Sequence, residues 1–183
     1  MAADHFFILT GGPGSGKTRL TEELTRRGYF AIEEVARKII REEIALGGEA
    51  LPAGDIGYRI EKMISRSIET YREALKRPNT PIIFDRGVLD YISYASRTNT
   101  PIPGELYRTA LSLTYNKRVF LTPPWMEIYC NDAERKQPFE EALEVYEHLV
   151  RAYSAIGYEL VEIPKTTVER RADFVIRHIN GSM

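Results

Sequence analysis

The residues from Gly11 to Thr18 have the types and the spacing needed to hold a chain of phosphates. They read Gly-Gly-Pro-Gly-Ser-Gly-Lys-Thr, which fits the pattern G-x-x-x-x-G-K-[ST]. Small residues let backbone N–H groups curl around a phosphate, Lys17 adds positive charge for the β- and γ-phosphates, and the Thr18 hydroxyl is a hard ligand for Mg²⁺. The pattern predicts a site for a nucleoside triphosphate and Mg²⁺, formed by Gly12, Pro13, Gly14, Ser15, Gly16, Lys17 and Thr18.

Asp85 and Arg86 follow the apolar run Pro81–Phe84 and place charges of both signs at its end. An acid that ends a buried strand beside a phosphate loop can hold Mg²⁺, directly or through water. Arg86 can reach either the phosphates or an anionic acceptor. The alternative for Asp85 is an N-cap of the helix expected from about Val88. We favour a metal-binding and catalytic role for Asp85, because the same chain also carries the phosphate loop.

Glu34 and Arg37 lie three residues apart at the start of a predicted helix, so they can share one of its faces. In a phosphoryl-transfer site, such a pair can add charge around the γ-phosphate and, with Arg86, help to position the acceptor. The alternative is a surface ion pair, with an acid favourably placed in a first helical turn. The spacing alone leaves both interpretations open.

A long charged connection at residues 123–138 follows the fourth predicted strand. It can act as a lid that brings Arg135 or Lys136 onto the triphosphate and excludes water. The alternative is the solvated start of a helix. The loop Pro164–Thr167, after the last predicted strand, either lies near the nucleotide base or is an ordinary loop that caps a helix.

The elements that must position these residues alternate along the chain. Short apolar runs predict five strands, at residues 6–10, 29–32, 81–84, 118–121 and 158–163. Helical spacing predicts helices at residues 16–27, 35–44, 56–75, 88–96, 105–114, 139–153 and 168–179, with Gly47 and Gly48 ending the second. This alternation favours an α/β fold with a five-stranded parallel sheet covered on both faces, in three layers. The phosphate-loop pattern lies between the first strand and its helix, which disfavours a mere glycine-rich turn.

The carboxyl ends of parallel strands share one edge of the sheet, and ligands bind at that edge in such folds. The residues to watch therefore follow positions 10, 33, 85, 122 and 163. The segments with unusual residues begin at these points.

Composition limits the classes of function. The chain has 183 residues, favouring one domain over residues 1–183, and a net charge of −1, so no strong field draws it to nucleic acid. The single cysteine, Cys130, excludes an internal disulfide, and no apolar run is long enough for a membrane span or signal. We therefore expect a cytoplasmic protein. Trp125 is expected in core packing, and His148 in a structural or surface role.

Taken together, G-G-P-G-S-G-K-T, E-E-V-A-R and D-R-G resemble the P-loop family of predicted ATPases related to nicotinamide-riboside-kinase domains. The resemblance spans nearly the whole chain, to the helix around Glu169–Arg171, and extends more remotely to deoxynucleoside and thymidylate kinases. It implies a P-loop NTPase fold, with Glu34 beside the acceptor hydroxyl and Asp85 in the Mg²⁺ and catalytic site. Gly87 departs from the thymidylate kinases, which usually carry an aromatic or small polar residue there.

The sequence thus predicts an Mg-ATP-dependent kinase for a small nucleoside- or nucleotide-like acceptor. Its catalytic residues would be Lys17, Glu34, Asp85, Arg86 and Arg135, with Thr18 and Asp85 organising the metal. The alternatives are an ATPase or GTPase switch and a regulatory nucleotide-binding module. The acceptor, the choice of ATP or GTP and the oligomeric state stay open.

Overall fold

The computed structural model describes residues 3–45, 55–129 and 138–181. Its centre is a five-stranded sheet in the order β2-β3-β1-β4-β5, and every neighbouring pair is parallel. The strands are β1 (Phe6–Gly11), β2 (Phe30–Ile32), β3 (Ile82–Asp85), β4 (Arg118–Thr122) and β5 (Glu159–Glu162). The expected three-layer α/β fold with a parallel sheet is confirmed.

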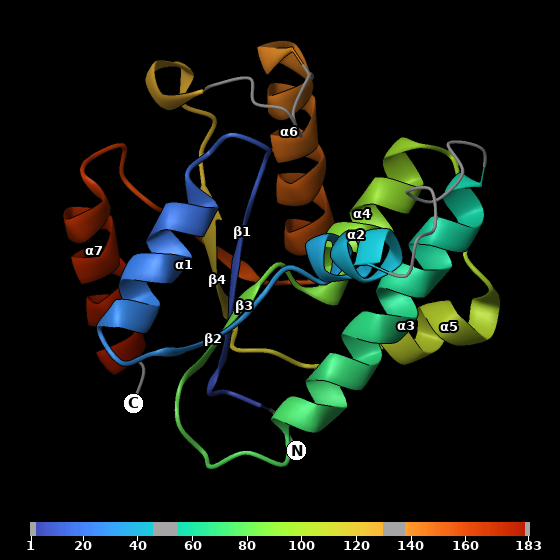
Figure 1. Cartoon of the computed structure of the whole chain (residues 1–183), viewed down its shortest axis with the longest axis horizontal. Helices are drawn as coiled ribbons and strands as arrows, with labels where there is room; N and C mark the ends of the chain where they lie inside the picture. The colour runs from blue at the N-terminus through green and yellow to red at the C-terminus, as the bar shows by residue number, and fades with distance from the viewer. Residues whose placement is uncertain (1–2, 46–54, 130–137, 182–183) are drawn as a thin grey trace.

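Helices cover both faces of the sheet (Figure 1). They are α1 (Lys17–Arg26), α2 (Val35–Ala45), α3 (Ile56–Ala74), α4 (Val88–Arg97), α5 (Gly104–Leu111), α6 (Phe139–Ala155) and α7 (Val168–Asn180), with a short 3-10 turn, η1 (Met126–Ile128). One face carries α1 and α7, and the other carries α2 to α6. Their limits lie within a few residues of those expected from hydrophobic spacing.

The central strand β1 divides the apolar interior into two parts. Side chains alternate across a strand, so Phe6 and Ile8 pack with the larger cluster against α3, α4 and α6, whereas Phe7 and Leu9 pack against α1 and α7. All six residues of β1 are buried. This is the burial expected of a central parallel strand, and it explains why the run is apolar without alternation.

The strand register brings distant residues to the carboxyl edge of the sheet. Leu9 is the partner of Asp85 on one side of β1, and Gly11 is the partner of Thr122 on the other. The loop that leaves β1 therefore begins between the ends of β3 and β4. This is the edge at which the sequence predicts the phosphate loop and the carboxylates of Glu34 and Asp85.

Part of the predicted lid can be described. Residues 123–129 contain η1, and Pro138 is the N-cap of α6. Arg135 and Lys136 lie outside the described residues, as do Gly47 and Gly48, the expected end of the second helix. Across the parts of the chain that the structure describes, no helix is both long enough and apolar enough to cross a membrane.

Replacing Ile64 of α3 with alanine should destabilise the fold, because this side chain is fully buried in the larger cluster. Removing its methyl groups leaves a cavity that costs about 2–5 kcal/mol of unfolding free energy, measured by urea denaturation. Ile56, at the start of the same helix, is 38% exposed and provides the control. Ile56→Ala should change stability by within about 0.5 kcal/mol, and equal losses for both variants would contradict the packing described.

Candidate functional site

The loop between β1 and α1 adopts backbone shapes that suit glycine. Gly11 has φ 144°, and a Cβ atom there would lie 2.0 Å from the Thr122 hydroxyl oxygen. Gly16 caps α1 with φ 79°, in the left-handed region. Ser15 fixes the loop from within, because its hydroxyl donates to the Gly12 carbonyl at 2.8 Å and lies 2.7 Å from the Thr122 hydroxyl. The sequence pattern therefore forms a tightly held loop between a strand and a helix.

The Lys17 ammonium group is bound by the loop itself. Its Nζ atom donates to the carbonyl oxygens of Gly11 at 2.7 Å and Gly12 at 2.8 Å. Burial, and after it the charge of Arg86, lowers the pKa of Lys17 from 10.5 to about 7, although Asp85 and Glu34 act in the opposite direction. The amino group of Lys17 is thus held by two backbone carbonyls of its own loop, and its pKa lies close to neutral pH.

Arg86 joins the phosphate loop to two carboxylates. Its Nε atom donates to Glu34 at 2.7 Å, and its Nη1 atom donates to Asp90 at 3.0 Å and to the Gly11 carbonyl at 3.2 Å. The backbone of Arg86 has φ 75°, a conformation rare for a residue with a side chain. The sequence predicted that Arg86 would reach phosphates or an anionic acceptor, whereas here its guanidinium group is held by protein groups.

Asp90 is part of this network and was missed in the sequence. It is buried, and its carboxylate accepts from the Thr10 hydroxyl at 2.5 Å, the Tyr153 hydroxyl at 2.6 Å and the Gly87 N–H at 3.0 Å, as well as from Arg86. Its place three residues after Gly87, in the first turn of α4, was the available signal, because an acid there can bind the N–H of the helix cap. The Tyr153 hydroxyl that binds its other carboxylate oxygen lies 63 residues away in the sequence.

Glu34 lies between two arginines. One carboxylate oxygen accepts from Arg86, and the other lies 3.2 Å from Nε of Arg37. Burial opposes ionisation of Glu34, but the charges of Arg86, Lys17 and Arg37 outweigh it and lower the pKa to about 2. The side chain is 14% exposed, so the alternative of a surface ion pair does not describe Glu34. At neutral pH this group is an ionised hydrogen-bond acceptor and a weak base.

Asp85 is a buried carboxylate whose Oδ1 atom has no hydrogen-bond partner among the described residues. Burial, followed by the charge of Glu34, raises its pKa, while Lys17 and Arg86 oppose the rise. The alternative role of Asp85 as a helix cap is wrong, because Gly87 is the N-cap of α4. An orphaned carboxylate oxygen beside the loop fits a hydrated divalent cation, for which Asp85 and the Thr18 hydroxyl are suitable oxygen donors. The described residues contain no cluster of three or more His, Cys, Asp or Glu that could hold a metal by itself.

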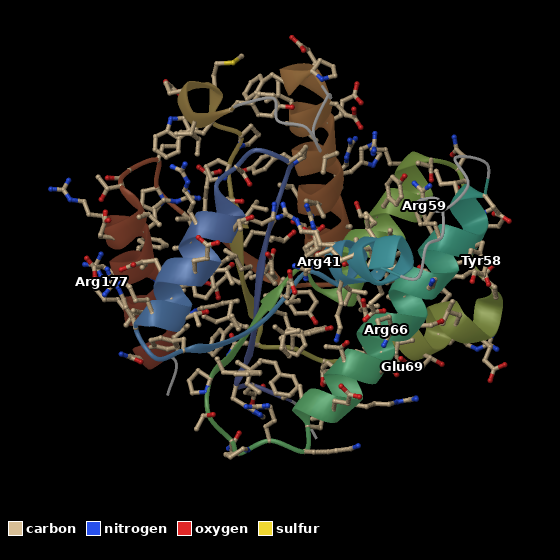
Figure 2. All side chains as sticks on the ribbon, in the orientation of Figure 1. Arg41, Tyr58, Arg59, Arg66, Glu69 and Arg177 are labelled. Atoms are coloured by element: carbon tan, nitrogen blue, oxygen red, sulfur yellow. The ribbon has the colours of Figure 1, made fainter. Side chains whose placement is uncertain are left out.

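A cavity of about 740 Å³ opens beside the loop. Its lining combines loop residues 13–18 and Glu34 with side chains from α2, α3, α4 and α6. Arg41 of α2 and Arg59 of α3 line it, and both lie across the sheet from Arg177 of α7 (Figure 2). His148 of α6, expected to have a structural or surface role, also lines the cavity.

The structure brings most of the other predicted residues together. Lys17, Thr18, Glu34, Arg37 and Arg86 all line the cavity. Asp85 does not belong to this lining; it is buried at the end of β3, directly before Arg86. Arg135, predicted to act from the lid, falls outside the described residues.

Comparison with known protein families identifies the family of this chain. The profile of the AAA domain family matches residues 6–171, so the chain belongs to that family. A search of curated proteins gives no match.

Among solved structures, NadR in complex with NR has a TM-score of 0.72 at 20% identity, over 97% of this chain and 51% of that one. Deoxyadenosine kinase from M. mycoides, with products dCMP and dCDP, has a TM-score of 0.59 at 16% identity, over 97% of this chain and 100% of that one. The YorR protein of Bacillus subtilis, in complex with phosphorylated GDP, has a TM-score of 0.57 at 14% identity, over 96% and 95%. This chain spans about half the length of the NadR chains. At these identities the likeness shows the fold alone.

Replacing Glu34 with glutamine should change how stability depends on pH. Because the folded pKa of about 2 lies below the ordinary 4.5, the ionised Glu34 stabilises the fold fully above about pH 4.5, and this contribution disappears as pH falls toward 2. Glu34→Gln should therefore lose up to about 3 kcal/mol of unfolding free energy near neutral pH. Urea denaturation at several pH values measures the difference between variant and wild type.

That difference should shrink toward zero as pH falls through the same window. The exposed Glu22 supplies a control, because Glu22→Gln should show no comparable effect. A Glu34→Gln deficit that stays constant down to about pH 2 would contradict the ionic network described for Glu34.

Proposed function

We propose that this AAA-family protein is a kinase that transfers the γ-phosphoryl group of Mg-ATP to a small nucleoside- or nucleotide-like acceptor. The observation that carries the proposal is that one cavity is lined by both the phosphate loop and the Glu34–Arg86 pair. A triphosphate on the loop would therefore face a carboxylate and a guanidinium group. A site for binding alone needs the loop but has no use for an acid directed at an acceptor.

The loop and Lys17 would bind the donor. Backbone N–H groups would surround the phosphates, and Lys17 would leave the carbonyls of Gly11 and Gly12 for the β- and γ-phosphates. This exchange is favourable because a phosphate offers full negative charge in place of carbonyl dipoles. These contacts are to phosphates, which ATP and GTP share, so the proposal covers both donors.

Thr18 and Asp85 would hold Mg²⁺ together with the phosphates and water. Bound there, the ion would neutralise charge that develops on the transferring group. The unpartnered Oδ1 atom of Asp85 supports this assignment, because a buried acceptor without a donor is costly unless a cation satisfies it.

Glu34 would orient the acceptor hydroxyl. Its lowered pKa makes it a poor proton acceptor in the resting state, but an ionised carboxylate is a strong hydrogen-bond partner for a hydroxyl. Phosphoryl transfer through a loose transition state depends more on alignment and charge than on a strong base. Arg37 and Arg86 would keep Glu34 in place and, with Arg135 from the lid, would stabilise charge on the phosphoryl group.

The acceptor would occupy the part of the cavity lined by side chains of α2, α3, α4 and α6. Its walls mix apolar side chains, Ile40, Met63, Val145 and Leu149, with the polar Tyr94, Arg97 and His148. Such a lining suits a flat ring joined to a sugar that carries hydroxyl groups. The ligands of the similar structures, NR on NadR and dCMP on deoxyadenosine kinase, belong to this class and support the choice.

Binding of Mg-ATP should take up protons above about pH 7, because Lys17 is partly deprotonated in the free protein and charged beside the phosphates. The affinity should be nearly constant below that pH and fall as pH rises toward about 9. Isothermal titration calorimetry in buffers with different protonation heats measures the uptake. Lys17→Ala should lose it and bind at least about 10-fold more weakly. Equal proton uptake by wild type and variant would contradict the role of Lys17.

Replacing Asp85 with asparagine should separate catalysis from stability. The variant keeps the size of the side chain but loses the metal-binding charge, so phosphoryl transfer should fall by about 100-fold or more. Its melting temperature should not fall, because burial disfavours the charged form of Asp85. The assay supplies Mg-ATP or Mg-GTP with nucleosides, ribosides and their monophosphates, and follows phosphorylated product.

Two outcomes of that assay would contradict parts of the proposal. Full activity in Asp85→Asn would contradict the metal-binding and catalytic role proposed for Asp85. Nucleotide hydrolysis that is rapid and independent of every acceptor would favour the nucleotide switch, which should also differ in conformation between its di- and triphosphate forms.

A further inference from the structure

Arg171, in the first turn of α7, touches the phosphate loop from outside the cavity. Its Nη2 atom donates to the Ser15 carbonyl oxygen at 3.0 Å, across 156 residues of sequence. The residue is 3% exposed and is absent from the cavity lining, whereas Ser15 and Gly16 both belong to that lining. Arg171 therefore contacts the loop without facing the proposed nucleotide site.

The surroundings of Arg171 are unusual for a buried cation. Within the described part of the chain it forms no ion pair, and its Nε atom has no hydrogen-bond partner. The guanidinium carbon lies 5.9 Å from the centre of the Trp125 ring, and a Cβ atom at Gly16 would approach Nη1 to 2.6 Å. Burying an arginine without a carboxylate is costly, so a structural role alone gives little reason for a cation at this position.

Peptide geometry connects this contact to the phosphates. The carbonyl of Ser15 and the N–H of Gly16 belong to one planar trans peptide, so they point in opposite directions. When Arg171 holds the carbonyl, the Gly16 N–H is directed away from Arg171. A cation at the carbonyl oxygen also polarises the peptide and strengthens its N–H as a donor.

We propose that Arg171 is a positioning residue for the triphosphate, acting through the Ser15–Gly16 peptide. It orients and polarises the Gly16 N–H so that this group binds a phosphate oxygen. Gly16 must be a glycine for this arrangement, both for its φ of 79° and because a side chain would meet the guanidinium group. The inference rests on the proposed nucleotide site and adds α7 to the elements that form it.

The test uses Arg171→Met and Arg171→Lys, with Arg170→Met as the control. Arg170 is the exposed neighbour on the same helix. Calorimetry measures the affinity of each folded variant for two probes, Mg-ATP and Mg-bound inorganic triphosphate. Arg171→Met should weaken the binding of both probes by a similar factor of about 10 to 100, because the lost guanidinium contact acts on phosphate binding and not on the base. Arg171→Lys should recover part of this loss, and Arg170→Met should bind both probes as wild type does.

Two results would overturn the proposal. One is wild-type affinity in Arg171→Met. The other is a loss for Mg-ATP with no loss for the inorganic triphosphate, which would place Arg171 in direct contact with the nucleoside. If Arg171→Met does not fold, Arg171→Lys carries the same comparison. Arg171→Lys should then weaken the binding of both probes by a similar factor, smaller than about 100-fold.

A measurement without nucleotide separates this proposal from the proposed function. The amide proton of Gly16 should resonate upfield in Arg171→Met relative to wild type, because the polarising cation is gone, and Arg170→Met should leave it unchanged. An unchanged Gly16 resonance contradicts the inference whether or not nucleotide binds. Failure of wild type to bind either probe, with the shift present, contradicts the proposed function alone.

Discussion

The ion pairs of Arg86 are the interaction on which the site depends. One guanidinium group joins Glu34 before α2, Asp90 in α4 and the Gly11 carbonyl at the end of β1. Tyr153 of α6 reaches the same network through Asp90. Because an unpaired charge in this buried position would be costly, α2, α4 and α6 are held together with the end of β1, where the phosphate loop begins. The parallel sheet brings them to one edge, and Arg86 sets their positions at that edge.

Several charged groups of the site are paired among the described residues. Glu34 is held by Arg86 and Arg37, and Lys17 by the carbonyls of its own loop. Asp85 differs, because one of its carboxylate oxygens is buried and lacks a hydrogen-bond partner among the described residues. In the proposed reaction, a triphosphate with Mg²⁺ would release Lys17 from the loop and supply the cation that Asp85 lacks. The substrate and its metal would thereby complete the electrostatics of the cavity.

Much of this arrangement could be predicted from the sequence, because it depends on local patterns. Neighbouring residues are enough to predict three of its features: the buried strand β1, the glycine-rich loop, and the shared helix face of Glu34 and Arg37. Asp90, Tyr153 and Arg171 could not be assigned in this way, since their roles depend on contacts across 63 to 156 residues. The type of Arg86 indicated an anion-binding residue, and only the fold shows that its guanidinium group also binds two carboxylates of the protein.

The most direct test of the central claim follows the γ-phosphoryl group itself. Wild-type protein is supplied with ATP labelled at the γ-phosphorus, Mg²⁺, and a mixture of nucleosides, ribosides and their monophosphates, and the products are separated. The proposed kinase predicts that the label appears in an ester of one acceptor, in equal amount to the ADP formed, and that little label is released as inorganic phosphate when acceptors are omitted. Release of label only as inorganic phosphate, at a rate that no acceptor changes, would contradict phosphoryl transfer as the function of this site.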